Sequence, residues 1–215
     1  MRLIGKGQSQ KNPHMCQACF TFLSRHHGGA EIELTLLFAD IRGSTTLAEG
    51  MPPSEFRAIL DRFYKVTSRA IFEHDGGVDK FVGDGVIALF FPMIAGEQHA
   101  ARGVEAARGI LVATGHEDRG GPWVPVGVGV HTGISWMGAV GEGSQTELTV
   151  VGDVANTTAR LASLAGAGEI LVTVEGARAA GLDPNLPRKS LELKGKQDVT
   201  EVVTLTVGAA AEVPA

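Results

Sequence analysis

The sequence predicts an α+β domain in which helices cover an antiparallel sheet. Three observations predict it: a short apolar run at 32–40, a long segment of helical hydrophobic spacing at 53–72, and two apolar runs joined by an Asp-Gly turn within 78–91. Short apolar runs indicate buried strands, and apolar residues three and four apart indicate an amphipathic helix. An Asp-Gly turn between two such runs indicates a hairpin.

The first elements follow one another in the order strand, helix, hairpin. The strand at 32–40 is followed by Gly43-Ser44-Thr45, which predicts a tight turn and a helix N-cap. The helix at 53–72 ends before a Gly-Gly pair, and the hairpin at 78–91 consists of VDKFV, a turn and VIALFF. These elements supply the first half of a βαββαβ unit.

The remaining elements alternate between helical spacing and strand-like alternation. They are a helix at 96–114, strands at 123–136, 139–140 and 148–151, a helix at 153–165, a strand at 170–172, a short helix at 174–180, and strands at 191–193 and 199–207. The order β-α-β-β-α-β is that of the ferredoxin-like split arrangement, an antiparallel sheet with helices on one face. We therefore predict a ferredoxin-like βαββαβ core with C-terminal additions.

Composition and charge exclude several classes of protein. Of the 215 residues, 44% are hydrophobic and 20% are charged, which predicts a buried core rather than wholesale disorder. The net charge of −5 gives no sign of a nucleic-acid surface, so no nucleic-acid partner is expected. No apolar run is long enough for a membrane span, and the polar N-terminus lacks a signal peptide, which predicts a cytoplasmic protein.

The chain divides into three parts by composition. Residues 1–31 are expected to be an arm or linker, residues 32–207 one domain, and residues 208–215 a flexible tail. The arm contains a C-x-x-C pair, Cys16 and Cys19, with histidines near it in the sequence. A metal site, a redox pair and two plain thiols are all compatible with this pattern.

Two carboxylates are expected to meet at one edge of the sheet. Asp40 ends an apolar strand and Asp84 lies at the tip of an apolar hairpin. In a ferredoxin-like sheet the first strand and the central hairpin are neighbours, so these carboxylates would converge. Oxygen ligands in this arrangement suit Mg²⁺ or Mn²⁺, and two such ions can assist phosphoryl transfer. The alternative is a helix cap and an ordinary turn residue.

Four other polar residues have side chains suited to a nucleotide. Asn156 and Arg160, four apart on a predicted helix, share a face and could hold a ribose and a developing phosphate charge. Lys80 is a hydrogen-bond donor and Thr149 can donate and accept, which complements the edge of adenine. Guanine would favour an acceptor such as Glu in place of Lys80. Each residue also has a plain interpretation as a surface or strand residue.

Three segments in order resemble the site motifs of class III nucleotide cyclases. They are LLFADIRGST at 36–45, DKFVGDG at 79–85 and VGDVANTTARL at 151–161. The resemblance covers about residues 32–207. It implies a cyclase fold and an adenylate cyclase that converts ATP to 3′,5′-cyclic AMP and pyrophosphate with two Mg²⁺ or Mn²⁺ ions per site.

The resemblance implies a role for each matching position. These roles are metal ligands at Asp40, Asp84 and the Ile41 carbonyl, adenine contacts at Lys80 and Thr149, a ribose contact at Asn156, transition-state stabilisation by Arg160, a phosphate cradle at Gly43, Ser44 and Thr45, and a phosphate contact from Lys194 or Lys196. Many family members carry Asp where this chain has Thr149. Threonine there is similar to a subclass that includes bicarbonate-responsive members.

The family builds its site across a dimer, so the resemblance also implies a homodimer. In the family the metal ligands come from one chain and the ribose and transition-state residues from the other. Because this chain holds both sets, two equivalent sites are expected. Eight glycines between Gly120 and Gly143 are expected to face the partner. The rival interpretations are a guanylate cyclase, a catalytically silent nucleotide-binding domain, and a dinucleotide cyclase, whose G-G-[DE]-[DE]-F hairpin is replaced here by Gly83-Asp84-Gly85.

Overall fold

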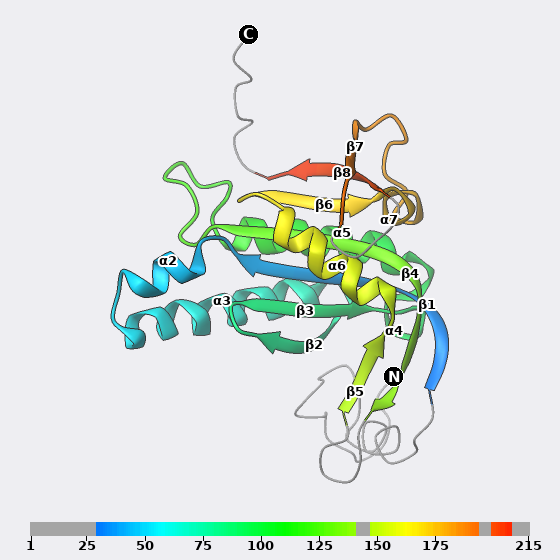
Figure 1. Cartoon of the computed structure of the whole chain (residues 1–215), viewed down its shortest axis with the longest axis horizontal. Helices are drawn as coiled ribbons and strands as arrows, with labels where there is room; N and C mark the ends of the chain where they lie inside the picture. The colour runs from blue at the N-terminus through cyan, green and yellow to red at the C-terminus, as the bar shows by residue number, and fades with distance from the viewer. Residues whose placement is uncertain (1–28, 141–146, 194–198, 208–215) are drawn as a thin grey trace.

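The protein is described by a computed structural model over residues 29–140, 147–193 and 199–207 (Figure 1). The elements within these ranges are β1 (Gly29–Ile41), α2 (Ser44–Glu49), α3 (Pro53–Glu73), β2 (Gly77–Val82), β3 (Gly85–Phe90), α4 (Pro92–Ala95), the 3₁₀ turn η1 (Gly96–Gln98), α5 (His99–Ala113), β4 (Val126–Val140), β5 (Glu147–Val151), α6 (Asp153–Leu164), β6 (Glu169–Thr173), α7 (Val174–Ala179), β7 (Arg188–Leu191) and β8 (Thr200–Thr206).

The described strands form one sheet in the order β2-β3-β1-β4-β6-β8-β7, with β5 paired to β4. In the stretch β2-β3-β1-β4 each strand is antiparallel to its neighbours, and with α3 and α5 these strands form the predicted ferredoxin-like core. The pairing of β4 with β6 is parallel, so the additions turn an antiparallel core into a mixed sheet. The predicted fold class is confirmed.

Several element boundaries differ from the prediction, including that of β1, which begins at Gly29 and not at 32. Strand β4 runs without a break from Val126 to Val140, whereas separate strands at 123–136 and 139–140 were expected. It continues because β1 starts at Gly29 and pairs with β4 as far as Gly138. Strand β7 ends at Leu191, where the predicted strand 191–193 begins, and α5 begins after a 3₁₀ turn.

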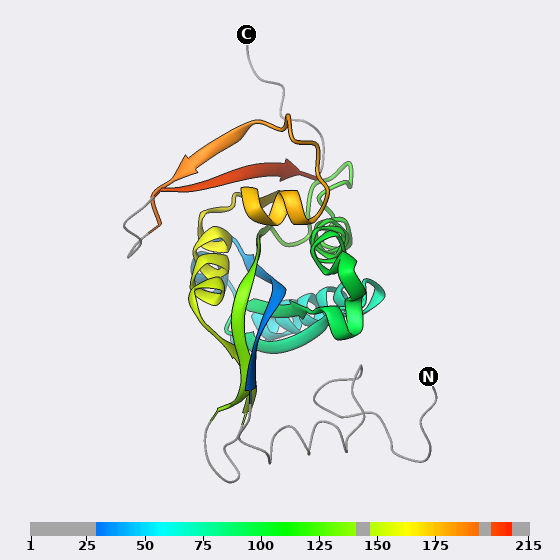
Figure 2. The ribbon, with the colours of Figure 1, turned by 90° about the vertical axis from the view of Figure 1, so that its right-hand side faces the viewer.

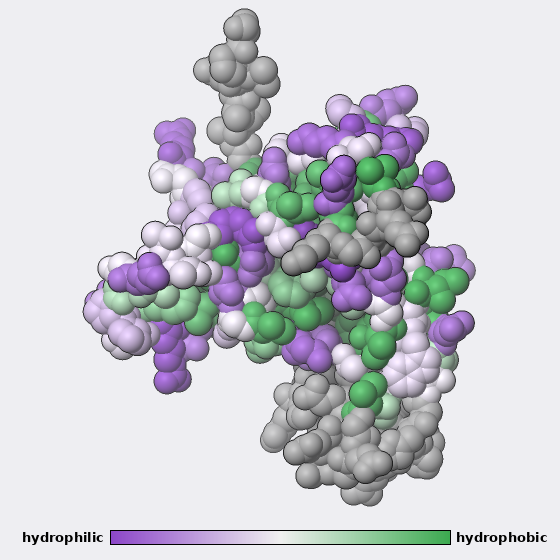
Figure 3. Space-filling view, in the orientation of Figure 1, coloured by the Kyte–Doolittle hydropathy of each residue, from purple (hydrophilic) through white to green (hydrophobic). Residues whose placement is uncertain are grey.

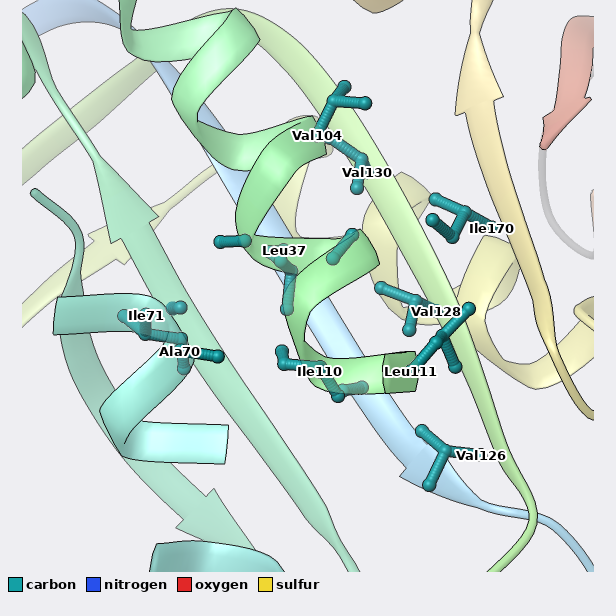
Figure 4. Packing of buried hydrophobic residues seen from close by; sticks show 14 of the residues in the cluster. Leu37, Ala70, Ile71, Val104, Ile110, Leu111, Val126, Val128, Val130 and Ile170 are labelled. Atoms are coloured by element: carbon teal, nitrogen blue, oxygen red, sulfur yellow. The ribbon is translucent and has the colours of Figure 1, made fainter. Parts of the chain in front are cut away.

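Helices α3 and α5 cover one face of the sheet (Figure 2). On β4, Val126, Val128 and Val130 alternate toward this face, where Ile110 of α5 packs among them (Figure 4). All four side chains are at most 1% exposed. Burial of each such side chain stabilises the fold by roughly 1.5–3 kcal/mol. This layer is the main core of the domain.

Helix α6 covers the opposite face, so helices lie on both sides of the sheet (Figure 2). Two of the β4 positions beneath it are glycines. A Cβ at Gly129 would lie 2.5 Å from the amide nitrogen of Ala162 and 2.6 Å from the carbonyl oxygen of Thr158, and one at Gly127 would lie 2.5 Å from the Ala165 oxygen. The expectation that this glycine-rich segment faces a partner chain is wrong for these two positions, because they let α6 of the same chain approach β4.

Candidate active site

Asp40 and Asp84 lie beside each other at one edge of the sheet. Asp40 is near the end of β1, where it pairs with Gly85 of β3. Asp84 occupies the turn before Gly85, and its carbonyl oxygen accepts a hydrogen bond of 3.3 Å from the amide of Ile41. The structure therefore brings together the two carboxylates that the sequence places 44 residues apart.

The surroundings of Asp40 disfavour the ionised form of its carboxyl group. Its side chain is 26% exposed. Burial raises the pKa of Asp40 to about 6, against a usual value of 3.8; the positive charge of Arg42 opposes this rise, whereas the charge of Asp84 and a hydrogen bond with it add to it. An ionised Asp40 is thus poorly compensated near neutral pH, which favours binding of a further cation.

These carboxylates suit a metal ion whose remaining ligands come from the substrate. The described ranges contain no group of three or more His, Cys, Asp or Glu side chains that could enclose a metal. Mg²⁺ is commonly held by one or two carboxylates together with substrate phosphates and water. Asp40 and Asp84 supply such a pair, and the role of the Ile41 carbonyl as a further ligand stays a prediction.

Arg42 is a site residue that the sequence reasoning missed. Its guanidinium forms an ion pair with Asp40, and its Nη1 donates a hydrogen bond of 3.0 Å to the carbonyl oxygen of Ser163 at the end of α6. Its amide also donates to the carbonyl of Pro125 at 2.8 Å. The available signal was its position two residues after Asp40. Arg42 ties the first carboxylate to α6.

The turn after β1 is built around a glycine. Gly43 has φ +67° and is itself the N-cap of α2, so neither Ser44 nor Thr45 supplies the side-chain cap suggested by the sequence. The first amide groups of a helix lack partners within the helix and can bind an anion. An open cleft of about 530 Å³ adjoins this turn, lined in part by Arg42, Gly43 and Pro125.

A β-bulge determines which face Lys80 occupies. Val78 pairs with Ala88, but Lys80 pairs with Ile87, so the register shifts at Asp79. An unshifted ladder would place Lys80 on the α3 face with Ala88, whereas Ile87 belongs to the α6 face. The bulge therefore turns Lys80 to the α6 face, which also bears Asp40. Simple alternation along the sequence contains no signal for this shift.

Asn156 and Arg160 lie on the side of α6 that faces away from the sheet. Thr157, Thr158 and Leu161 of the same helix are buried against the sheet. Asn156 is exposed and Arg160 is half-buried. The two side chains thus share one outward stripe of the helix, as their spacing of four predicted.

Thr149 lies at the other end of the sheet from the carboxylates. It pairs with Gly138 of β4, whereas Asp40 pairs with Gly127 of that strand. The two positions are separated by roughly 35 Å of strand. The structure therefore does not gather all predicted site residues around Asp40.

Some predicted residues cannot be placed. Lys194 and Lys196 lie outside the described residues, as do Cys16 and Cys19. Within the described ranges, no helix has both the length and the apolar character needed to cross a membrane.

Comparison with known proteins identifies relatives along most of the chain. The family described as adenylate and guanylate cyclase catalytic domain matches residues 30–206. An adenylate cyclase of Anabaena cylindrica is 33% identical over 181 residues, which cover 79% of this chain and 36% of the relative. Adenylate cyclase 1 of Rhizobium meliloti (strain 1021) is 33% identical over 146 residues, which cover 64% of this chain and 22% of the relative. The chain spans about a third or less of the length of these relatives.

Solved structures share the fold. The crystal structure of the guanylyl cyclase Cya2 matches with a TM-score of 0.74 and 28% identity, over 86% of this chain and 98% of that one. The adenylyl cyclase CyaB from P. aeruginosa matches with a TM-score of 0.72 and 24% identity, over 85% and 98% of the two chains. The similar structures thus include proteins named for either nucleotide.

Proposed function

The chain belongs to the adenylate and guanylate cyclase catalytic domain family, and from this premise we propose that it converts ATP to 3′,5′-cyclic AMP and pyrophosphate. The observation that carries the proposal is the meeting of Asp40 and Asp84 on the sheet face to which the bulge turns Lys80. A carboxylate pair for metal-bound phosphates and a donor for the base then share one face. The cytoplasmic location stays a prediction from the sequence.

The residues at the sheet edge divide the work of binding the triphosphate. Asp40 and Asp84 would hold the metal ions, and the amides of the Gly43 turn would bind phosphate oxygens. When bound, Mg²⁺ or Mn²⁺ lowers the pKa of the attacking 3′-hydroxyl and neutralises phosphate charge. Asn156 would orient the ribose, and Arg160 would stabilise charge on the phosphate in the transition state. No protein nucleophile is required.

The preference for ATP is supported by Lys80 and by the two relatives named adenylate cyclase. Lysine only donates hydrogen bonds, which suits the acceptor at adenine N1 and not the donor at guanine N1. Initial rates with either nucleotide and Mg²⁺ or Mn²⁺ test this, and we expect ATP to be favoured at least about tenfold. Faster turnover of GTP would show a guanylate cyclase, and turnover of neither would favour the silent nucleotide-binding domain.

Substitution of Lys80 sharpens the nucleotide test. Lys80→Glu should reduce the ATP rate and narrow the ratio of ATP to GTP rates, because an acceptor replaces the donor. Lys65→Glu on the exposed surface of α3 is the matched control, and it should leave the ratio unchanged. If the ratio of ATP to GTP rates is the same in both variants, Lys80 does not take part in base recognition. Bicarbonate in a parallel assay tests the expectation attached to Thr149.

A site shared by two chains is supported by where the predicted residues lie. Asn156 and Arg160 face outward from α6, and Thr149 is distant along the strand from Asp40. The α6 face also carries apolar side chains (Figure 3). The partly buried apolar residues there include Ile32, Ile87, Ile94, Met137 and Val150. A second copy packed on this face would cover them and bring its outward residues to the carboxylates.

Mixing two inactive variants tests the shared site. Asp40→Ala and Arg160→Ala should each be inactive alone, because each homodimer lacks one half of both sites. After mixing and subunit exchange, about a quarter of wild-type activity should return, since half of the dimers are mixed and each has one intact site. An inactive mixture in which heterodimers are confirmed would contradict the shared site.

A further inference from the structure

We propose that Tyr64 is a positioning residue for the metal site, because its hydroxyl group holds the hairpin turn that carries Asp84. The inference rests on the proposed function, since it concerns the same two carboxylates. Helix α3 contacts this turn directly: the Tyr64 hydroxyl donates a hydrogen bond to the carbonyl oxygen of Gly83, the residue before Asp84.

The turn is held by contacts from outside the hairpin. Strand β2 ends at Val82 and β3 begins at Gly85, so the ladder does not include Gly83 and Asp84. Gly83 has φ +58°, a conformation that glycine adopts with little strain. The Gly83 carbonyl is held by Tyr64, and the Asp84 carbonyl accepts the amide of Ile41. The peptide groups on both sides of the Asp84 α-carbon are therefore fixed by neighbouring elements.

The aromatic ring of Tyr64 is held independently of its hydroxyl. Its centroid lies 4.4 Å from that of Phe81 on β2 and 6.0 Å from that of Phe63 on α3. These ring contacts stay in a phenylalanine variant. The substitution Tyr64→Phe therefore removes the bond to the turn while keeping the packing that surrounds it.

The two contacts restrain the turn from opposite sides. The amide of Ile41 on β1 binds the Asp84 carbonyl, and the Tyr64 hydroxyl on α3 binds the Gly83 carbonyl. Asp84 is thereby kept beside Asp40, with which it must share the metal. Restraint of the turn before metal binds pre-organises the site.

Mn²⁺ binding, followed by electron paramagnetic resonance on the full chain, tests the inference without any turnover. In Tyr64→Phe we expect the apparent dissociation constant for Mn²⁺ to rise about three- to tenfold, the equivalent of one hydrogen bond. The Mn²⁺ concentration that gives half-maximal rate should rise by the same factor. The rate at saturating Mn²⁺ should stay near wild type, and the melting temperature should change little.

Thr67→Val provides the matched control, because it deletes a hydroxyl group one turn further along α3. The Thr67 hydroxyl donates to the carbonyl oxygens of Phe63 and Tyr64 and not to the hairpin. It should leave Mn²⁺ affinity unchanged. Equal Mn²⁺ affinity in wild type and Tyr64→Phe would overturn the inference, as would a loss of affinity in Thr67→Val of the same size. If wild type binds Mn²⁺ but converts neither ATP nor GTP, the proposed function fails while the role of Tyr64 is still decided by binding.

Discussion

The two faces of the central sheet are made by the same strands but from different residues. Toward α3 and α5, the strands present Leu37, Val86 and Val128, all fully buried. Toward α6, they present Asp40, Lys80 and glycines beside a smaller apolar cluster that includes Leu34 and Leu36. Successive residues of these strands thus alternate between a mainly apolar core and a face on which polar and apolar side chains are mixed.

This difference shows how one sheet can separate stability from function. The apolar face gains free energy from burial and contains no group needed for the proposed reaction. The α6 face places like charges together and replaces strand side chains with glycine, both of which reduce stability. A substitution on the first face should therefore act on unfolding, and one on the second should act on the site.

The largest effect on stability is expected at the apolar face. Ile110→Ala on α5 removes a fully buried side chain and should lower the free energy of unfolding by about 2–5 kcal/mol, measured by urea denaturation. Activity per folded molecule should stay close to wild type. Val112→Ala, two residues further on and at a position 45% exposed, is the control and should cost much less. A selective loss of turnover in Ile110→Ala would break the separation of the two faces.

A second prediction concerns Gly127 and Gly129, the β4 glycines beneath α6. In Gly129→Ala the added methyl would meet the backbone of α6, so the helix must shift. We expect a loss of about 1–3 kcal/mol in unfolding free energy, and turnover should fall as well because α6 carries Asn156 and Arg160. A packing change on this face, unlike one on the face toward α3 and α5, should therefore lower turnover.

Gly109→Ala on α5 is the matched control for Gly129→Ala. A Cβ at Gly109 would lie 3.5 Å from the Ala70 and His74 side chains, which is ordinary contact. Because alanine favours the helix over glycine, this variant should be more stable by roughly 0.5–1 kcal/mol with unchanged turnover. Unchanged turnover in Gly129→Ala as well would mean that the position of α6 does not matter for the proposed reaction.

The contrast also explains what the sequence could predict. Hydrophobic spacing depends on the apolar face, so α3 and the core order of strands were correctly predicted from residues such as Phe63 and Ile71. The neighbouring positions of Asp40 and Asp84 followed from that topology. The sequence pattern was sufficient wherever a repeating contact with the core decides the structure.

Features set by single long-range contacts could not be predicted in this way. The bulge at Asp79 reverses the face of Lys80 without any change in composition. The pairing of Arg42 with both Asp40 and the end of α6 joins segments more than 100 residues apart. The glycines of β4 were assigned to a partner chain because nothing in their pattern indicates which helix approaches them.

The smallest predicted effect measures what the site costs in stability. The pKa of Asp40 in the folded chain, about 6, lies above its usual value of 3.8, so the folded state binds a proton between these pH values that the unfolded state does not. Stability contributed through Asp40 therefore falls as pH rises from about 4 to 6 and stays low above pH 6. Without metal, Asp40→Asn should then be more stable than wild type at pH 7.5, and this advantage should shrink by pH 5.

Urea denaturation in the presence of a metal chelator measures the difference in unfolding free energy between Asp40→Asn and wild type. We expect Asp40→Asn to be more stable by about 1 kcal/mol, because loss of the ion pair with Arg42 offsets part of what is gained by removing the buried charge. Added Mn²⁺ should stabilise wild type and reverse the order of the two proteins, since ligand binding to the folded state adds to its stability. Asp61→Asn, on the exposed surface of α3, is the control and should show neither effect. If Asp40→Asn is less stable than wild type at pH 7.5 in the presence of chelator, the carboxylates help to stabilise the fold. Both faces of the sheet would then contribute to stability.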